Sequence, residues 1–117
     1  NYRYREFADG LKAAGHYREA TKYYRRVLKL NGGFAAHFQL AMIYKQENSP
    51  QKAVTECLAG LRAFEDQYYV RLDSEVDIRA VLGAISLLKS TGHAREASKL
   101  ENEPVINAAI SGHGRKQ

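Results

Sequence analysis

The side chains able to act as nucleophiles, bases or metal ligands are few and scattered along the 117 residues. No two histidines have metal-ligand spacing on a helix, and no nucleophile lies near a base in the sequence. Asn31-Gly32-Gly33 reads as a helix stop rather than a phosphate-binding loop. We therefore expect no catalysis, no cofactor and no metal. The residues concerned are His16, His37, His93, His113 and Cys57.

The single cysteine excludes an internal disulfide and a cysteine-cluster metal site. We expect Cys57 to be a small buried apolar side chain on a helix. A lone thiol fits a reducing compartment and so favours the cytoplasm.

The chain opens at Asn1 rather than Met and lacks a signal-peptide pattern, so we expect a piece of a longer protein. No apolar run approaches the ~18–20 residues that cross a bilayer, so we expect no membrane association.

The net charge of +5 is concentrated at one end of the chain. Residues 1–30 hold eight basic and three acidic groups, whereas the other 87 residues hold ten of each. Such an asymmetry attracts an acidic partner without determining the fold.

Apolar residues recur at helical spacing almost everywhere, and no segment shows the alternation of a strand. We expect an all-α chain with antiparallel helix pairs over 1–33, 34–66 and 74–101. A short helix over 104–111 and a disordered tail over 112–117 complete a single domain over 1–111. The first pair is indicated by a stripe of Tyr4, Phe7, Ala8 and Leu11, followed by Ala20, Tyr24, Val27 and Leu28.

Several local signals place the helix ends. Ser49 followed by Pro50 predicts an N-cap and first turn, and Ser74 with Asp77 three residues later predicts another helix start. Gly60 lies in mid-helix, which we expect to be offset by close approach of a neighbouring helix. The segment 65–73 is compatible with either a continued helix or a loop.

Internal repetition is the strongest signal in the sequence. The segment GHYREA at 15–20 recurs as GHAREA at 92–97, and NSPQKA fills the same position at 48–53. Each is a turn followed by an alanine on the second helix, where a small side chain lets two helices approach closely.

This pattern resembles the tetratricopeptide repeat, a helix-turn-helix of 34 residues. The resemblance spans about Tyr2 to Leu100 and implies a right-handed superhelical stack of about three repeats. The third repeat departs from the family at Ile85 and Glu101, and an insertion of about ten residues lies near 65–73. The matching residues are Tyr4, Phe7, Ala8, Leu11, Gly15, Tyr17, Ala20, Tyr24, Val27 and Leu28 in the first repeat, Leu40, Ala41, Tyr44, Ala53, Cys57 and Leu61 in the second, and Val81, Leu88, Gly92, Ala97 and Leu100 in the third.

The resemblance also implies a concave groove, lined by the first helix of each repeat, that binds a peptide or helix of a partner protein. Phe38 and Met42 are apolar without belonging to a packing stripe, and for them burial under a neighbouring helix remains an equal alternative. The groove positions carried over are Tyr2, Arg5, Asp9, Lys12, Phe38, Gln39, Met42, Lys45, Arg79, Leu82, Ser86 and Lys89.

Family members that clamp the C-terminal carboxylate of chaperones have a fixed set of donors in this groove. The corresponding positions here are Arg5, Asp9, Gln39, Arg79 and Gly83. Asp9 would repel a carboxylate and Gly83 supplies no donor, so we favour a looser acidic or amphipathic peptide instead.

Two other functions fit the sequence less well. Self-association through the ends of the stack is the main alternative to an adaptor or scaffold role. Nucleic-acid binding is a weaker one, since the basic residues at 18–29 lack a known motif and read equally well as a solvated helix face.

Overall fold

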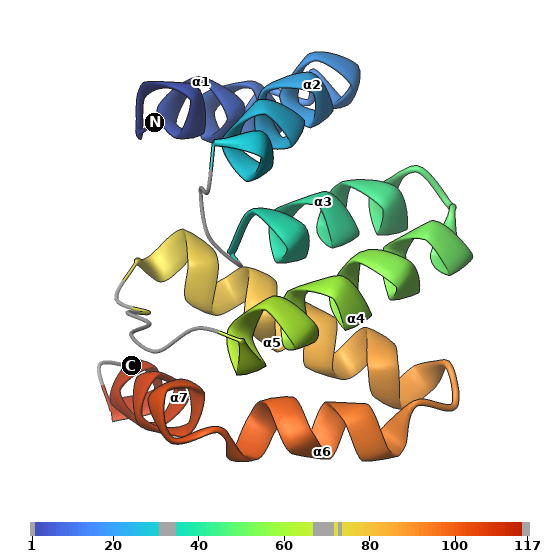
Figure 1. Ribbon diagram of the computed structural model, residues 1–117, viewed down its shortest axis with the longest axis vertical. Coiled ribbons are helices and arrows are strands. Elements are labelled where there is room, and N and C mark those ends of the chain that lie inside the picture. Colours follow the sequence, from blue (N-terminus) through green and yellow to red (C-terminus); the bar gives the residue numbers. More distant parts are fainter. Residues whose placement is uncertain (1, 31–34, 67–71, 73, 116–117) are drawn as a thin grey trace.

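The computed structural model of the chain describes residues 2–30, 35–66, 72 and 74–115, and for side chains 3–30, 35–66, 72 and 74–112. Within these residues the chain is all-α, with seven helices and no strand, as the sequence predicts (Figure 1). None of these helices is long and apolar enough to cross a membrane. They are α1 (Tyr2–Ala13), α2 (Tyr17–Lys29), α3 (Ala35–Gln46), α4 (Pro50–Glu65), α5 (Glu75–Ser90), α6 (Ala94–Asn102) and α7 (Pro104–Arg115).

The helices form three consecutive hairpins, α1–α2, α3–α4 and α5–α6, with α7 packed on the last of them (Figure 1). The helix pairs expected over 1–33, 34–66 and 74–101 correspond to these hairpins where the chain is described, except that α6 ends at Asn102. The predicted stop at Asn31–Gly33 lies outside the described residues.

The three hairpins share one turn geometry. Gly15, Asn48 and Gly92 each adopt a positive φ, of 84°, 59° and 84°. The next N–H, that of His16, Ser49 or His93, donates to the carbonyl of Leu11, Tyr44 or Leu88, at 2.8 Å in every turn. This is the hydrogen bond of a Schellman C-cap, which needs a left-handed residue before it. The repeated segments in the sequence therefore correspond to repeated backbone structure.

The alanine that follows each turn is fully buried. Ala20, Ala53 and Ala97 each have 0 % exposure. Their N–H groups donate at 3.0 Å to the carbonyls of His16, Ser49 and His93. Ser49 is the residue before α4 and Pro50 opens that helix as predicted, but the Ser49 side chain makes no capping hydrogen bond.

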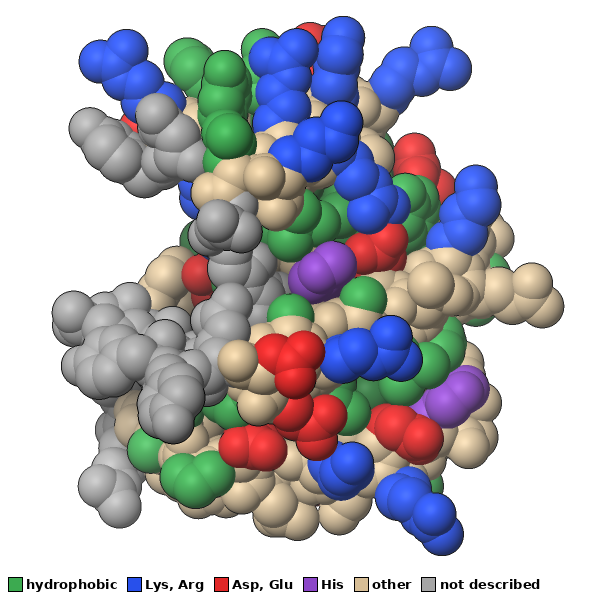
Figure 2. Space-filling view, in the orientation of Figure 1, with side chains coloured by type: hydrophobic (Ala, Val, Ile, Leu, Met, Phe, Trp, Pro, Cys, Tyr) green, Lys and Arg blue, Asp and Glu red, His purple; other side chains and the backbone are tan. Residues whose placement is uncertain are grey.

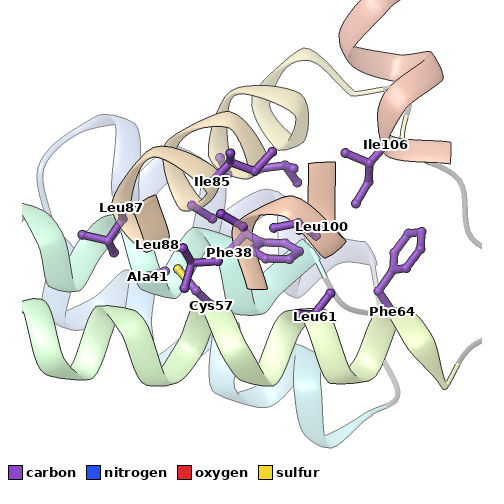
Figure 3. Close-up of a cluster of buried hydrophobic side chains, with 14 of the residues drawn as sticks. Phe38, Ala41, Cys57, Leu61, Phe64, Ile85, Leu87, Leu88, Leu100 and Ile106 are labelled. Carbon is purple, nitrogen blue, oxygen red and sulfur yellow. The ribbon is translucent and has the colours of Figure 1, made fainter. Parts of the chain in front are cut away.

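Helix α3 is buried on two sides and separates two hydrophobic cores. Ala36, Leu40 and Ile43 pack with α1 and α2, whereas Phe38 and Ala41 pack with α4 to α7. A helix that is apolar around most of its circumference belongs in an interior. Figure 3 shows the larger core, in which Phe38 lies among side chains that include Leu88 and Leu100.

Gly60 on α4 allows α3 to come close, as predicted. A Cβ added at Gly60 would lie 2.8 Å from Cζ of Phe38 and 3.2 Å from Cβ of His37. Real Cβ atoms do not approach carbon atoms so closely, so glycine here makes room for the Phe38 ring. Cys57, one turn earlier, is fully buried in the same core, also as predicted.

The connection between α4 and α5 agrees only partly with the sequence signals. Helix α4 ends at Glu65, and of the segment that follows, residues 67–71 and 73 lie outside the described residues. Ser74 precedes α5 as predicted, but its side chain makes no capping hydrogen bond. Asp77, predicted to complete that cap, instead pairs with Arg5 of α1.

Two expectations for the ends of the domain need correction. Helix α7 runs to Arg115, so residues 112–115 are helical rather than a disordered tail. Each glycine in this stretch disfavours a helix by only about 1 kcal/mol relative to alanine. The packing of Ile106 and Ile110 on the core stabilises the preceding turns of α7, from which the helix continues. Phe7, predicted to belong to a packing stripe, is 58 % exposed. Residues 116 and 117 lie outside the described residues.

Candidate functional site

A cleft of about 470 Å³ lies where α1, α3 and α5 converge. Five of the predicted groove residues line it, namely Asp9, Lys12, Met42, Lys45 and Arg79. The remaining lining comes from Ala13, Tyr17, Tyr24, Gln46, Val76 and Ala80. The first helices of the three hairpins therefore bring together five of the twelve side chains that the family resemblance assigned to a groove.

The base of the cleft holds a network of charged and polar groups. Asp9 accepts hydrogen bonds from Nε of Arg5, at 3.1 Å, and from the Tyr24 hydroxyl. Nη2 of the same guanidinium pairs with Asp77 on α5. Burial alone would lower the pKa of Arg5, but the carboxylates of Asp77 and Asp9 raise it above its usual value. Asp9 and Asp77 therefore share the single positive charge of Arg5.

The network also keeps the Tyr24 hydroxyl protonated. Burial and the hydrogen bond to Asp9 raise the pKa of its hydroxyl well above the usual value. A neutral phenol donates one hydrogen bond and is a poor nucleophile, which suits a structural role. Since Arg5 is occupied by two carboxylates, it is not an available cation of the cleft, contrary to its predicted role.

Three cations surround the rim and walls of the cleft. Lys12 is partly buried, and desolvation lowers its pKa although Asp9 and Asp77 act in the opposite direction. Neither Lys12 nor Lys45 forms an ion pair within the described part of the chain. Arg79 pairs with Glu75 one turn away at 3.2 Å, but both side chains are largely exposed. Such a pair is weak and easily exchanged for a ligand carboxylate.

Met42 provides the apolar wall on α3. It lines the cleft and packs against Gly83 of α5, where an added Cβ would meet the Met42 sulfur and lie 3.2 Å from its Cε. Val76, at 45 % exposure, adds a second apolar side chain to the lining. The cleft thus combines cations with apolar surface.

Two predicted groove residues are buried instead. Phe38 has 0 % exposure because α3 packs on α4 through Gly60, so of the two alternatives, burial is the one observed. Gln39 also has 0 % exposure, and its Nε2 donates to Oδ1 of Asp77 at 3.0 Å and to the carbonyl of Val76 at 3.2 Å. Both residues position α3 and α5 and present no surface to a ligand.

Three further predicted groove residues lie away from the cleft. Leu82, Ser86 and Lys89 are on α5 and do not line it. Leu82 packs against the larger core, and Lys89 pairs with Glu101 of α6 at 3.3 Å. The side chain of Tyr2 lies outside the described residues.

A second polar cluster joins α2, α3 and α4 and was not anticipated. Glu56, 7 % exposed, accepts a hydrogen bond from Arg25 at 2.6 Å and lies 3.0 Å from Nδ1 of His37. Arg25 also donates to the Tyr44 hydroxyl at 2.9 Å. Burial would raise the pKa of Glu56, but its bonds to His37 and Arg25 lower it below the usual value. The only sign of this cluster in the sequence is the position of Glu56, next to Cys57, which was expected to be buried.

Within the described residues, no group of three or more histidine, cysteine, aspartate or glutamate side chains is arranged to hold a metal ion. No protein-family model matches the chain, and neither a curated protein nor a solved structure matches it significantly.

Proposed function

We propose that the chain is a non-catalytic protein-binding module of tetratricopeptide type, which holds an acidic peptide or amphipathic helix of a partner in the cleft between α1, α3 and α5. The observation that carries the proposal is the cleft lining, where Lys12 and Lys45 lie beside apolar Met42 and Val76 and form no ion pair with any described residue. Adaptor and scaffold proteins use such mixed surfaces to recognise short segments.

The charge balance of the cleft supports an acidic ligand. Asp9, the acid in the lining, already has the positive charge of Arg5 beside it and a hydrogen bond from Tyr24. The ammonium of Lys12 is partly desolvated and forms no ion pair with a described carboxylate, so a ligand carboxylate would stabilise it. The chaperone-tail mode does not fit, because Arg5 is paired and Gln39 is buried.

The test is selection of random peptides displayed on phage, followed by titration of the enriched peptides by fluorescence anisotropy. We expect enriched peptides to combine acidic and apolar residues. The variant Lys45→Glu/Arg79→Glu should weaken their binding by about tenfold or more, because both cations line the cleft.

The matched control is Arg62→Glu/Arg95→Glu, which changes the net charge equally at exposed positions of α4 and α6 that do not line the cleft. It should leave the affinity within about twofold, since exposed charges at a distance are screened by salt. Equal loss of binding in both variants, or enrichment of basic peptides, would refute the proposed function.

A further inference from the structure

The outer face of the first hairpin carries exposed apolar and cationic side chains that the cleft does not use. Phe7 on α1 is 58 % exposed, and Leu30, just after α2, is 53 % exposed. Figure 2 shows Lys and Arg side chains gathered with hydrophobic ones at this end of the molecule. We call Tyr4, Phe7, Tyr23, Arg26 and Leu30 the aromatic–arginine surface; none of these residues lines the cleft.

The aromatic rings hold one arginine in place. The rings of Tyr4 and Tyr23 stack with their centroids 6.0 Å apart, and the centroid of the Phe7 ring lies 5.8 Å from that of Tyr23. The Arg26 guanidinium lies 5.7 Å from the centroids of both tyrosine rings. Cation–π contacts of this kind hold the guanidinium near the rings, while its N–H groups remain able to bind a carboxylate through two hydrogen bonds.

Arg26 forms no ion pair within the described part of the chain. Lys22 and Lys29 are also exposed, and they lie four residues before and three residues after Arg26, so they flank it on the surface of α2. Tyr23, Arg26 and Leu30 have i, i+3, i+7 spacing and share one face. The surface therefore presents a restrained arginine between exposed apolar side chains, with further cations beside it.

We propose that the aromatic–arginine surface is a second docking site, separate from the cleft, for an acidic amphipathic helix of a partner protein. A carboxylate of that helix pairs with Arg26, and its apolar side chains contact Phe7 and Leu30. The charges are complementary, since the exposed cations of α2 outnumber its one acid, Glu19. Helix α2 has 13 residues and is about 20 Å long, which matches about four turns of a partner helix.

A nucleic acid fits this surface less well than an acidic helix. Bases stack on open aromatic faces, whereas Tyr4 and Tyr23 stack on each other and Arg26 lies over both. The exposed Leu30 offers no stacking surface to a base. Carboxylates on an apolar helix face match the surface better.

The test is a titration of the full chain with a synthetic amphipathic helix of about 14 residues carrying glutamates beside a leucine face. Two variants separate the sites, Phe7→Gln/Arg26→Gln on the aromatic–arginine surface and Lys45→Glu/Arg79→Glu in the cleft. We expect a binding event that Phe7→Gln/Arg26→Gln weakens by about tenfold and that Lys45→Glu/Arg79→Glu leaves unchanged. Circular dichroism should show both variants folded, because the substituted side chains are exposed.

Three controls complete the experiment. A peptide with the same leucine face and lysines in place of glutamates should not bind, and Arg95→Gln, an exposed arginine on α6, should bind like the wild type. The inference is wrong if Phe7→Gln/Arg26→Gln retains full affinity, or if the lysine peptide binds equally well. It is also wrong if oligouridine binds this surface in preference to the acidic peptide, or if light scattering shows a dimer that Phe7→Gln dissociates. Binding in the cleft is tested separately, by the effect of Lys45→Glu/Arg79→Glu on the peptides selected from the phage library.

Discussion

Arg5 on α1 and Asp77 on α5 form an ion pair between the first and third hairpins, across 72 residues of sequence. Both side chains are mostly buried, at 19 % and 14 % exposure. The contact fixes α1 and α5, the two outer walls of the cleft, relative to each other. The same Asp77 accepts a hydrogen bond from the side-chain amide of Gln39 on α3, the helix between them.

Removing the charge of Asp77 should therefore destabilise the domain. Asp77→Asn leaves a buried guanidinium with a single carboxylate, and we expect a loss of about 1–3 kcal/mol in the free energy of unfolding measured in urea. The comparison is Lys99→Gln, which removes an ion pair to Glu65 between two largely exposed side chains. That change should remain within about 0.5 kcal/mol. Equal effects would mean that the Arg5–Asp77 pair contributes no more than a surface contact.

Gly60 and Gly10 should respond in opposite directions to alanine. Gly60→Ala places a Cβ against the Phe38 ring, and overpacking of this kind costs about 1–3 kcal/mol, more than the gain in helix propensity. Gly10→Ala on α1 meets nothing within 4 Å and should stabilise the domain by up to about 1 kcal/mol. Thermal and urea unfolding of the two variants measure the difference. Stabilisation by Gly60→Ala would contradict the close packing of α3 on α4.

The buried Glu56 should make the domain sensitive to acid. Its pKa in the folded protein lies below the ordinary value of 4.5, so its stabilising contribution is complete above that pH. The contribution is lost as the pH falls through the lower, folded pKa, because unfolding then takes up a proton. We expect Glu56→Gln to cost about 1 kcal/mol at neutral pH and much less near pH 3. A difference between wild type and variant that does not change with pH would show that the ionised carboxylate does not matter.

Cys57 should be protected from thiol reagents in the folded protein. Burial, with a smaller contribution from the charge of Glu56, raises the pKa of its thiol to about 12. At pH 8 we expect its reaction with a chromogenic disulfide to be slower than that of a free cysteine by about two orders of magnitude or more. The reaction should become rapid in denaturant. Rapid labelling without denaturant would mean that the larger core opens readily around α4.

The local features of the fold could be predicted because each has a local cause. Gly15, Asn48 and Gly92 stop helices through their own backbone conformations, and the alanine after each turn marks where the paired helices touch. Helix α3 was harder, because its sequence left Phe38 equally compatible with the groove and with burial, whereas in the structure α3 is covered on two sides and buries Phe38. Nothing local in the sequence indicates which hairpin covers a helix.

The site could be predicted less completely than the fold. Lys12, Met42, Lys45 and Arg79 lie around one cleft, and the resemblance to the repeat family had assigned all four to a groove. Arg5 and Gln39 were expected to meet a ligand but bind Asp77 instead. The sequence predicted that Asp77 completes a helix cap with Ser74. No spacing rule connects Asp77 with Arg5, which lies 72 positions away. Long-range ion pairs of this kind depend on how the hairpins pack.

The central claim is that the cleft between α1, α3 and α5 binds an acidic segment of another protein. The most direct measurement is a titration of the isotope-labelled chain with an enriched acidic peptide, followed by backbone amide chemical shifts. We predict that the largest changes occur around Lys12, Met42, Lys45 and Arg79, with little change on α6. Changes confined to residues outside the cleft, or no saturable change at all, would contradict the claim.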